Sequence, residues 1–169
     1  GTLDLNDYDI SLVELHLRNG TVLRLTGDED VTLSGGFYSY ADNTIEYYLA
    51  SLEISLDIQD SSMMGNTYNN LGIVYFDWEE WEKSIYYYRL SYRIDSLRGN
   101  ILGQAQTLNN IAIVYDERGN DNEALRIYVN SLNLAKKASD PFQIAVSSSN
   151  IGTIYLESND YDMAEDYFN

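Results

Sequence analysis

The stretches NNLGIVY (69–75), NNIAIVY (109–115) and SNIGTIY (149–155) are three versions of one pattern, each 40 residues after the last. The same step separates an aromatic set and a serine set: Tyr48, Tyr88, Tyr128 and Phe168, and Ser51, Ser91 and Ser131. A fixed step of this length is typical of proteins built from stacked structural repeats. The step therefore predicts the architecture before any single element is considered.

Each copy contains two stretches with helical spacing. Apolar residues recur every three or four positions across residues 65–77, which predicts a first helix. A polar turn at 78–80 precedes a second helix at about 81–97, and Arg98-Gly99-Asn100 is a typical end for it. The same reading predicts helices at about 102–117, 122–138, from Ser139-Asp140-Pro141 to 157, and from 161 onward.

These copies resemble the tetratricopeptide repeat family, through an L-G-x-x-Y box in the first helix and an A-x-x-x-F/Y box in the second. The boxes are Leu71-Gly72-Tyr75 with Ser84-Tyr88, Ile111-Ala112-Tyr115 with Ala124-Tyr128, and Ile151-Gly152-Tyr155 with Ala164-Phe168. The resemblance implies an all-α fold, a right-handed superhelix of antiparallel helical hairpins (an α-solenoid). The step is similar to that of the family's long-helix variety. We expect repeats at about 37–60, 65–98, 102–138 and 142–169.

Residues 1–36 follow the pattern less closely, and we expect a degenerate repeat or an irregular segment there. The stretch 44–58 keeps the spacing of a second helix, but its partner would fall in LTGDEDVTLSGG (25–36), a poor helix former. Because NDYDIS (6–11) echoes NDYDMA (159–164), a helix is preferred for residues 8–26. The alternative is a β-hairpin turning at Asn19-Gly20. A two-residue turn would pair Leu15 with Arg24, which breaks strand alternation.

The formal net charge of −17, from 27 acids and 10 bases, argues against nucleic acid or an anionic membrane as a partner, because both attract basic surfaces. The sequence has no apolar run of 18 residues, so no membrane span is predicted. The acidity serves either solubility or the choice of a basic partner. The run Asp28-Glu29-Asp30 is interpreted as solvated.

The chain offers little for catalysis or metal binding. It has no cysteine, and His16 is its only histidine, which excludes thiol chemistry and sites with two histidines. The stretch DERGNDNE (116–123) lacks the spacing of a calcium loop and falls in an expected turn. Without a nucleophile–base pair we expect no enzyme, no cofactor and no metal ion.

In the family that these repeats resemble, the first helices line a concave groove. The side chains that would point there form a floor of amide and apolar groups with an acidic lip. They are Asn66, Asn69, Asn70, Ile73, Phe76, Asp77, Gln106, Asn109, Asn110, Ile113, Asp116, Glu117, Val146, Ser149, Asn150, Thr153, Leu156 and Glu157. Stacked amides can hold an extended peptide, because each can donate and accept. Alternatively, Asn70, Asn110 and Asn150 bond to neighbouring helices and set the stacking of the repeats.

We therefore expect a scaffold that binds a neutral or basic peptide or protein segment. The groove lacks the lysines and arginines with which the family's chaperone-tail binders hold a carboxylate. Beyond the repeat boxes, Tyr47, Tyr86, Tyr87 and Tyr92 provide either an aromatic surface or further core. The alternative function is a structural, oligomerisation or sensory module of a larger bacterial signalling protein. Weak self-association is also expected through a C-terminal edge around Ile154, Tyr155, Tyr167 and Phe168.

Overall fold

The computed structural model describes residues 13–17, 21–25 and 40–169, with side chains from residue 44 onward. The chain divides into two compact units, Gly1–Ala50 and Ser51–Asn169. The expectations for 6–11, for 26–36 and for Asp28-Glu29-Asp30 lie outside the described residues. The division between residues 36 and 37 stays a prediction.

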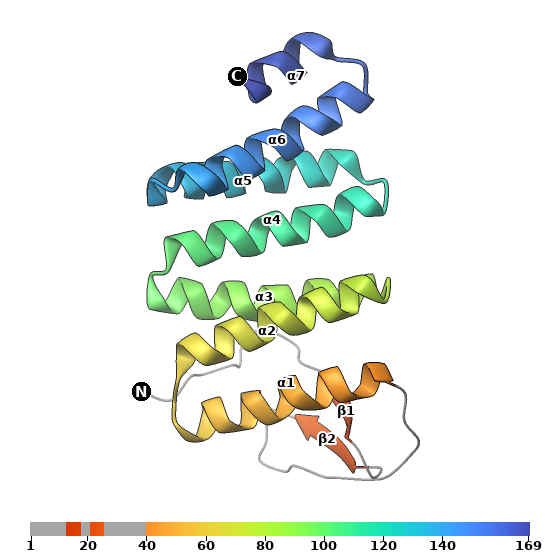
Figure 1. Cartoon of the computed structure of the whole chain (residues 1–169), viewed down its shortest axis with the longest axis vertical. Helices are drawn as coiled ribbons and strands as arrows, with labels where there is room; N and C mark the ends of the chain where they lie inside the picture. The colour runs from red at the N-terminus through yellow and green to blue at the C-terminus, as the bar shows by residue number, and fades with distance from the viewer. Residues whose placement is uncertain (1–12, 18–20, 26–39) are drawn as a thin grey trace. The chain divides into compact units, whose positions relative to one another are not determined.

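In the first unit, β1 (Val13–Leu17) and β2 (Thr21–Leu25) form an antiparallel two-stranded sheet (Figure 1). The helix preferred for residues 8–26 is therefore wrong where these strands lie. The register pairs Leu15 with Leu23 and Glu14 with Arg24. Three residues separate the strands, whereas the turn considered from the sequence has two. The extra residue shifts the register by one, so that Val13 pairs with Leu25 and Leu15 with Leu23. His16 lies on β1.

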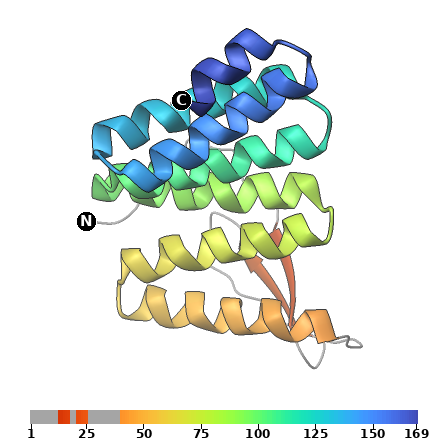
Figure 2. The ribbon, with the colours of Figure 1, turned by 45° about the horizontal axis from the view of Figure 1, so that its top comes forward.

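Within the described residues the rest of the chain forms helices at the predicted positions. They are α1 (Tyr40–Asp57), α2 (Ser61–Asp77), α3 (Trp81–Arg98), α4 (Ile101–Glu117), α5 (Asp121–Ala138), α6 (Pro141–Glu157) and α7 (Tyr161–Phe168). Figures 1 and 2 show that α2 to α7 follow one another with alternating direction. This is the all-α stack of antiparallel hairpins that the 40-residue step predicts.

A 20-residue step in the turns produces this regularity. A residue with left-handed backbone closes each helix, at Gln59, Glu79, Gly99, Gly119, Ser139 and Asn159. The residue after it is the N-cap of the next helix. In five of these six turns the N-cap side chain is an Asp or Asn that accepts a backbone N–H, at Asp60, Asn100, Asn120, Asp140 and Asp160. Such caps satisfy donors that the first helical turn leaves unpaired. The predicted ends at Gly99 and Asp140 are confirmed.

The core of the second unit lies between the helices of each hairpin and between hairpins. Tyr88 and Tyr128 are buried, with 3% and 1% of their surfaces exposed, as predicted. A Cβ on Gly72 would lie 2.5 Å from the Tyr88 ring, and the Ser84 hydroxyl donates to the Gly72 carbonyl at 2.8 Å. The small residues of the boxes thus allow the paired helices to approach closely.

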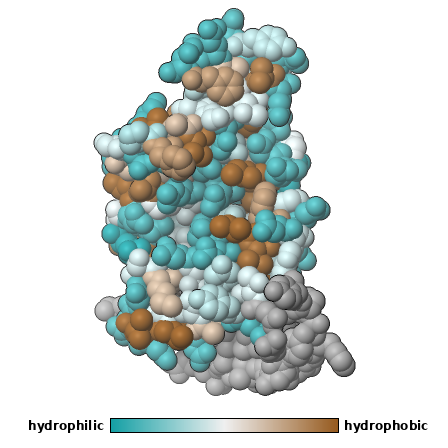
Figure 3. Space-filling view, viewed as in Figure 1, coloured by the Kyte–Doolittle hydropathy of each residue, from teal (hydrophilic) through white to brown (hydrophobic). Residues whose placement is uncertain are grey.

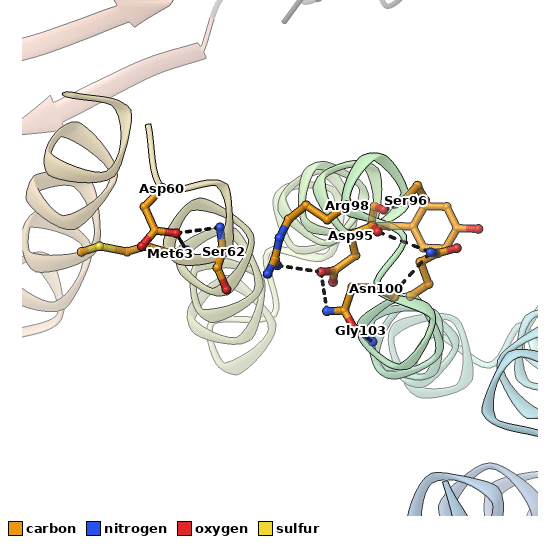
Figure 4. Close-up of polar contacts among 10 residues, drawn as sticks. Asp60, Ser62, Met63, Asp95, Ser96, Arg98, Asn100 and Gly103 are labelled. Atoms are coloured by element: carbon orange, nitrogen blue, oxygen red, sulfur yellow. Dashed lines mark hydrogen bonds and ion pairs between the residues drawn. The ribbon is translucent and has the colours of Figure 1, made fainter. Parts of the chain in front are cut away.

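A buried carboxylate joins α3 to α4 (Figure 4). The Asn100 amide donates to Asp95 at 2.7 Å, the Arg98 guanidinium lies 3.5 Å from the same oxygen, and Asn100 accepts from the Gly103 backbone. Gly103 has no side chain because a Cβ there would overlap the Asp95 carboxylate. Ser55 and Ala135 occupy the equivalent positions of the other repeats. This polar connection is therefore particular to the junction between α3 and α4.

Candidate functional site

The residues predicted for the groove lie on α2, α4 and α6, and many of them are exposed. We call the exposed strip the first-helix face; it consists of Asn66, Ile73, Asp77, Gln106, Glu117, Ser149, Thr153 and Glu157. Spacings of four, seven and eleven residues keep these side chains on one side of each helix. Figure 3 shows apolar residues as small separate patches among hydrophilic ones on the side in view.

The asparagines between these exposed positions connect neighbouring first helices. Asn110 donates to Asn69 Oδ1 at 3.0 Å, and Asn150 donates to Asn109 Oδ1 at 3.1 Å. Each bond joins residues 41 positions apart. The second residue of the Asn-Asn or Ser-Asn pair in one repeat donates to the first asparagine of the pair in the preceding repeat. Asn109 is only 5% exposed. We call these two hydrogen bonds the asparagine ladder. They fix the register of α2, α4 and α6 against one another.

One end of the first-helix face is acidic. Asp77, Glu117 and Glu157 occupy the last position of α2, α4 and α6, and these three helices contain no lysine or arginine. Burial raises the pKa of Asp116, and the charges of Glu157 and Asp121 raise it further, while a 3.4 Å hydrogen bond from Tyr128 opposes the rise. A positive group that approaches such a carboxylate stabilises its charged form and lowers its pKa again.

Two of the second helices, α3 and α5, have the opposite charge. Helices α3 and α5 hold seven bases and four acids. The bases are Lys83, Arg89, Arg93, Arg98, Arg126, Lys136 and Lys137. Composition alone conceals this separation, because the chain as a whole is strongly acidic.

The additional tyrosines have different environments. Tyr87 is buried and stacks on Tyr75, with ring centroids 5.2 Å apart, so it belongs to the core. Tyr86 and Tyr92 are half-buried, and Tyr47 is 72% exposed. Burial raises the pKa of Tyr68 to about 12. Tyr47 is therefore exposed and Tyr86 and Tyr92 are partly exposed, whereas Tyr87 fits the alternative of further core.

The described residues contain no cluster of three or more His, Asp or Glu side chains suited to a metal ion. The acidic stretch 116–123 forms the end of α4, the turn and the start of α5. Across the described parts of the chain, no helix has both the length and the apolar character needed to cross a bilayer.

Six successive antiparallel helices with a 20-residue step define a helical-repeat protein. A sequence model of the tetratricopeptide repeat family matches residues 103–169. Residues 103–169 are therefore similar to the tetratricopeptide repeat family, which confirms the resemblance inferred from the boxes.

Solved structures show the same fold. The apo form of RapI is 18% identical, with a TM-score of 0.53 over 76% of this chain and 59% of RapI. MamA is 15% identical, with a TM-score of 0.51 over 79% of this chain and 92% of MamA. This chain thus spans about three-fifths of the length of RapI. No curated protein gives a significant sequence match.

Proposed function

We propose that the second unit is a protein–protein interaction scaffold without catalytic activity, and that a partner segment binds on the first-helix face. The observation that carries this proposal is the separation of roles along α2, α4 and α6. Leu71, Ile111 and Ile151 form core on one side of these helices. The opposite side exposes amide, apolar and acidic groups that the core does not use.

The asparagine ladder suits the first-helix face to binding, because it holds three helices in register before a partner arrives. Preorganisation reduces the entropy that a partner must overcome. Each ladder bond uses one oxygen of Asn69 or Asn109 and one nitrogen of Asn110 or Asn150. The amide nitrogen of Asn69 and the amide oxygen of Asn110 stay available to a peptide backbone. Exposed Asn66 and Gln106 extend this amide surface.

The charge of the first-helix face favours a neutral or basic segment. Asp77, Glu117 and Glu157 are exposed and have no ion-pair partner within the described residues. A lysine or arginine of the partner would meet them in water, so each contact is modest and weakens with salt. Specificity for one partner then depends on contacts with the Ile73 side chain and the Thr153 methyl group, together with the backbone contacts.

Selection of random short displayed peptides on the full chain tests this proposal. We expect neutral or basic peptides, and about a tenfold loss of affinity for the combined variant Asp77→Asn, Glu117→Gln, Glu157→Gln, measured by fluorescence anisotropy. The matched control is Asp162→Asn, Glu165→Gln, Asp166→Asn on α7, which removes the same charge from exposed positions elsewhere. Equal losses in both variants, or selection of acidic peptides only, would contradict it.

A second variant separates binding from structure. Asn66→Ala with Gln106→Ala removes exposed amides outside the ladder, so affinity should fall while the unfolding midpoint stays unchanged. Asn122→Ala with Asn130→Ala on α5 is the control, since both residues are exposed on a second helix. Unchanged peptide affinity with reduced stability would support the alternative, a purely structural module.

A further inference from the structure

A hollow of about 470 Å³ opens between α3, α4 and α5, away from the first-helix face. Its apolar lining comes from Leu108 and Ile111 of α4 and from Ile127 and Leu134 of α5, with the rings of Tyr92 and Tyr115 beside them. Ligand pockets in proteins commonly have about 300–1,000 Å³. The hollow is therefore large enough for one side chain of a partner together with some of its adjacent backbone.

The rim of the hollow carries more positive than negative charge. Arg126 donates two hydrogen bonds to Glu123, at 2.8 and 2.6 Å. Arg89, on the facing helix α3, is exposed and makes no ion pair within the described residues. Two guanidinium groups thus share one carboxylate. A guanidinium presents several donors in a plane, which fits an incoming carboxylate.

The same hollow offers polar groups for a peptide backbone. Asn130 and Asn133 line it from α5, and both side chains are exposed. The arrangement combines an apolar floor, the exposed Arg89 guanidinium and two exposed amides within one site. A few polar groups around an apolar floor are typical of binding sites.

We propose that this hollow binds an acidic segment of a partner protein, placing one apolar side chain between α3 and α5 and a neighbouring carboxylate on Arg89. The segment differs in charge from the one proposed for the first-helix face, because α3 and α5 hold an excess of bases. The two surfaces share helix α4 but no side chain, so a substitution can remove binding at one surface and leave the other unchanged.

The peptide selection described above tests this proposal through a second class of binders. We expect peptides in which Asp or Glu adjoins Leu, Ile or Phe. Their affinity should fall about tenfold in Arg89→Gln, and binding should be lost in Asn130→Trp, which fills the hollow from an exposed position. Lys136→Gln is the matched control, since this exposed base on α5 does not line the hollow.

Circular dichroism should show that each variant keeps the helical content of the native chain, because the changed side chains are exposed. The variant Asp77→Asn, Glu117→Gln, Glu157→Gln should retain the acidic peptides, which separates this site from the first-helix face. The proposal is overturned if the selection yields no acidic class. It is equally overturned if acidic peptides bind Arg89→Gln and Asn130→Trp as tightly as the native chain.

Discussion

Helices α2, α4 and α6 follow the same 40-residue step as helices α3 and α5, but the two sets carry net charges of opposite sign. Helices α2, α4 and α6 carry four acids and no base, and a ladder of asparagines joins them. Helices α3 and α5 carry an excess of bases, and α4 forms the floor of an open hollow between them. The 40-residue repeat constrains the residues that pack the helices against one another. It does not constrain the exposed residues, so the first-helix face and the surface around the hollow can differ in charge.

The largest effect should come from the core that the two surfaces share. Tyr128 lies on α5 with 1% of its surface exposed. Tyr128→Ala should lower the free energy of unfolding by about 3–5 kcal/mol, because it removes a large buried ring and leaves a cavity. Chemical denaturation measures the change, with Tyr161→Ala, a 61% exposed tyrosine, as control. A loss of unfolding free energy similar to that of the control would show that the Tyr128 ring does not stabilise the packing of the helices.

Alkaline pH should weaken the same core. Burial raises the pKa of Tyr68 and of Tyr88 from 10.0 to about 12. Their contribution to stability is therefore complete below pH 10 and is lost as the pH rises through about 12, since the unfolded chain releases these protons first. As the pH rises through this window, each of the two tyrosines should contribute a decrease of up to about 1.4 kcal/mol per pH unit in the free energy of unfolding.

Denaturant titrations across this pH window measure the slope. Tyr88→Phe removes one titrating group and should make the slope shallower, whatever its effect on stability at neutral pH. A slope that is zero in the native chain, or unchanged in Tyr88→Phe, would contradict the burial of these hydroxyls.

A smaller effect separates the two helix sets directly. Asn110→Ala removes the donor to Asn69 and should cost about 1–2 kcal/mol, because one hydrogen bond is lost and its acceptor is left unpaired. Asn130→Ala, on an exposed position of α5, should stay within about 0.5 kcal/mol of the native chain. Both variants replace Asn by Ala within a helix, so the gain in helix propensity is the same in both and cancels when the two changes in stability are compared. Equal costs would mean that the ladder does not stabilise the stack.

The sequence predicted the helices well because several independent signals coincide in them. The boxes repeat every 40 residues, and residues such as Gly99 and Asp140 mark the ends of helices by local backbone chemistry. The β-hairpin was missed for a local reason as well. The assumed turn length was wrong by one residue, and a shift of one residue exchanges the pairing of every residue in a strand.

The candidate surfaces were only partly predictable. The positions of Asn66, Ile73 and Asp77 on one side of a helix follow from helical period alone. Whether Asn110 meets Asn69 or a partner depends on the spacing of α2 and α4, which no single-sequence pattern provides. The hollow beside Arg89 depends on the packing of three helices, and Arg89 alone looks like an ordinary surface base.

Nuclear magnetic resonance tests the central claim most directly, by following backbone amide signals while a selected neutral or basic peptide is added. The proposed function predicts that the shifted signals concentrate on α2, α4 and α6, around Asn66, Asn110 and Thr153, and that added salt reduces the affinity. Shifts confined to α3 and α5, with the first-helix face unchanged, would contradict it.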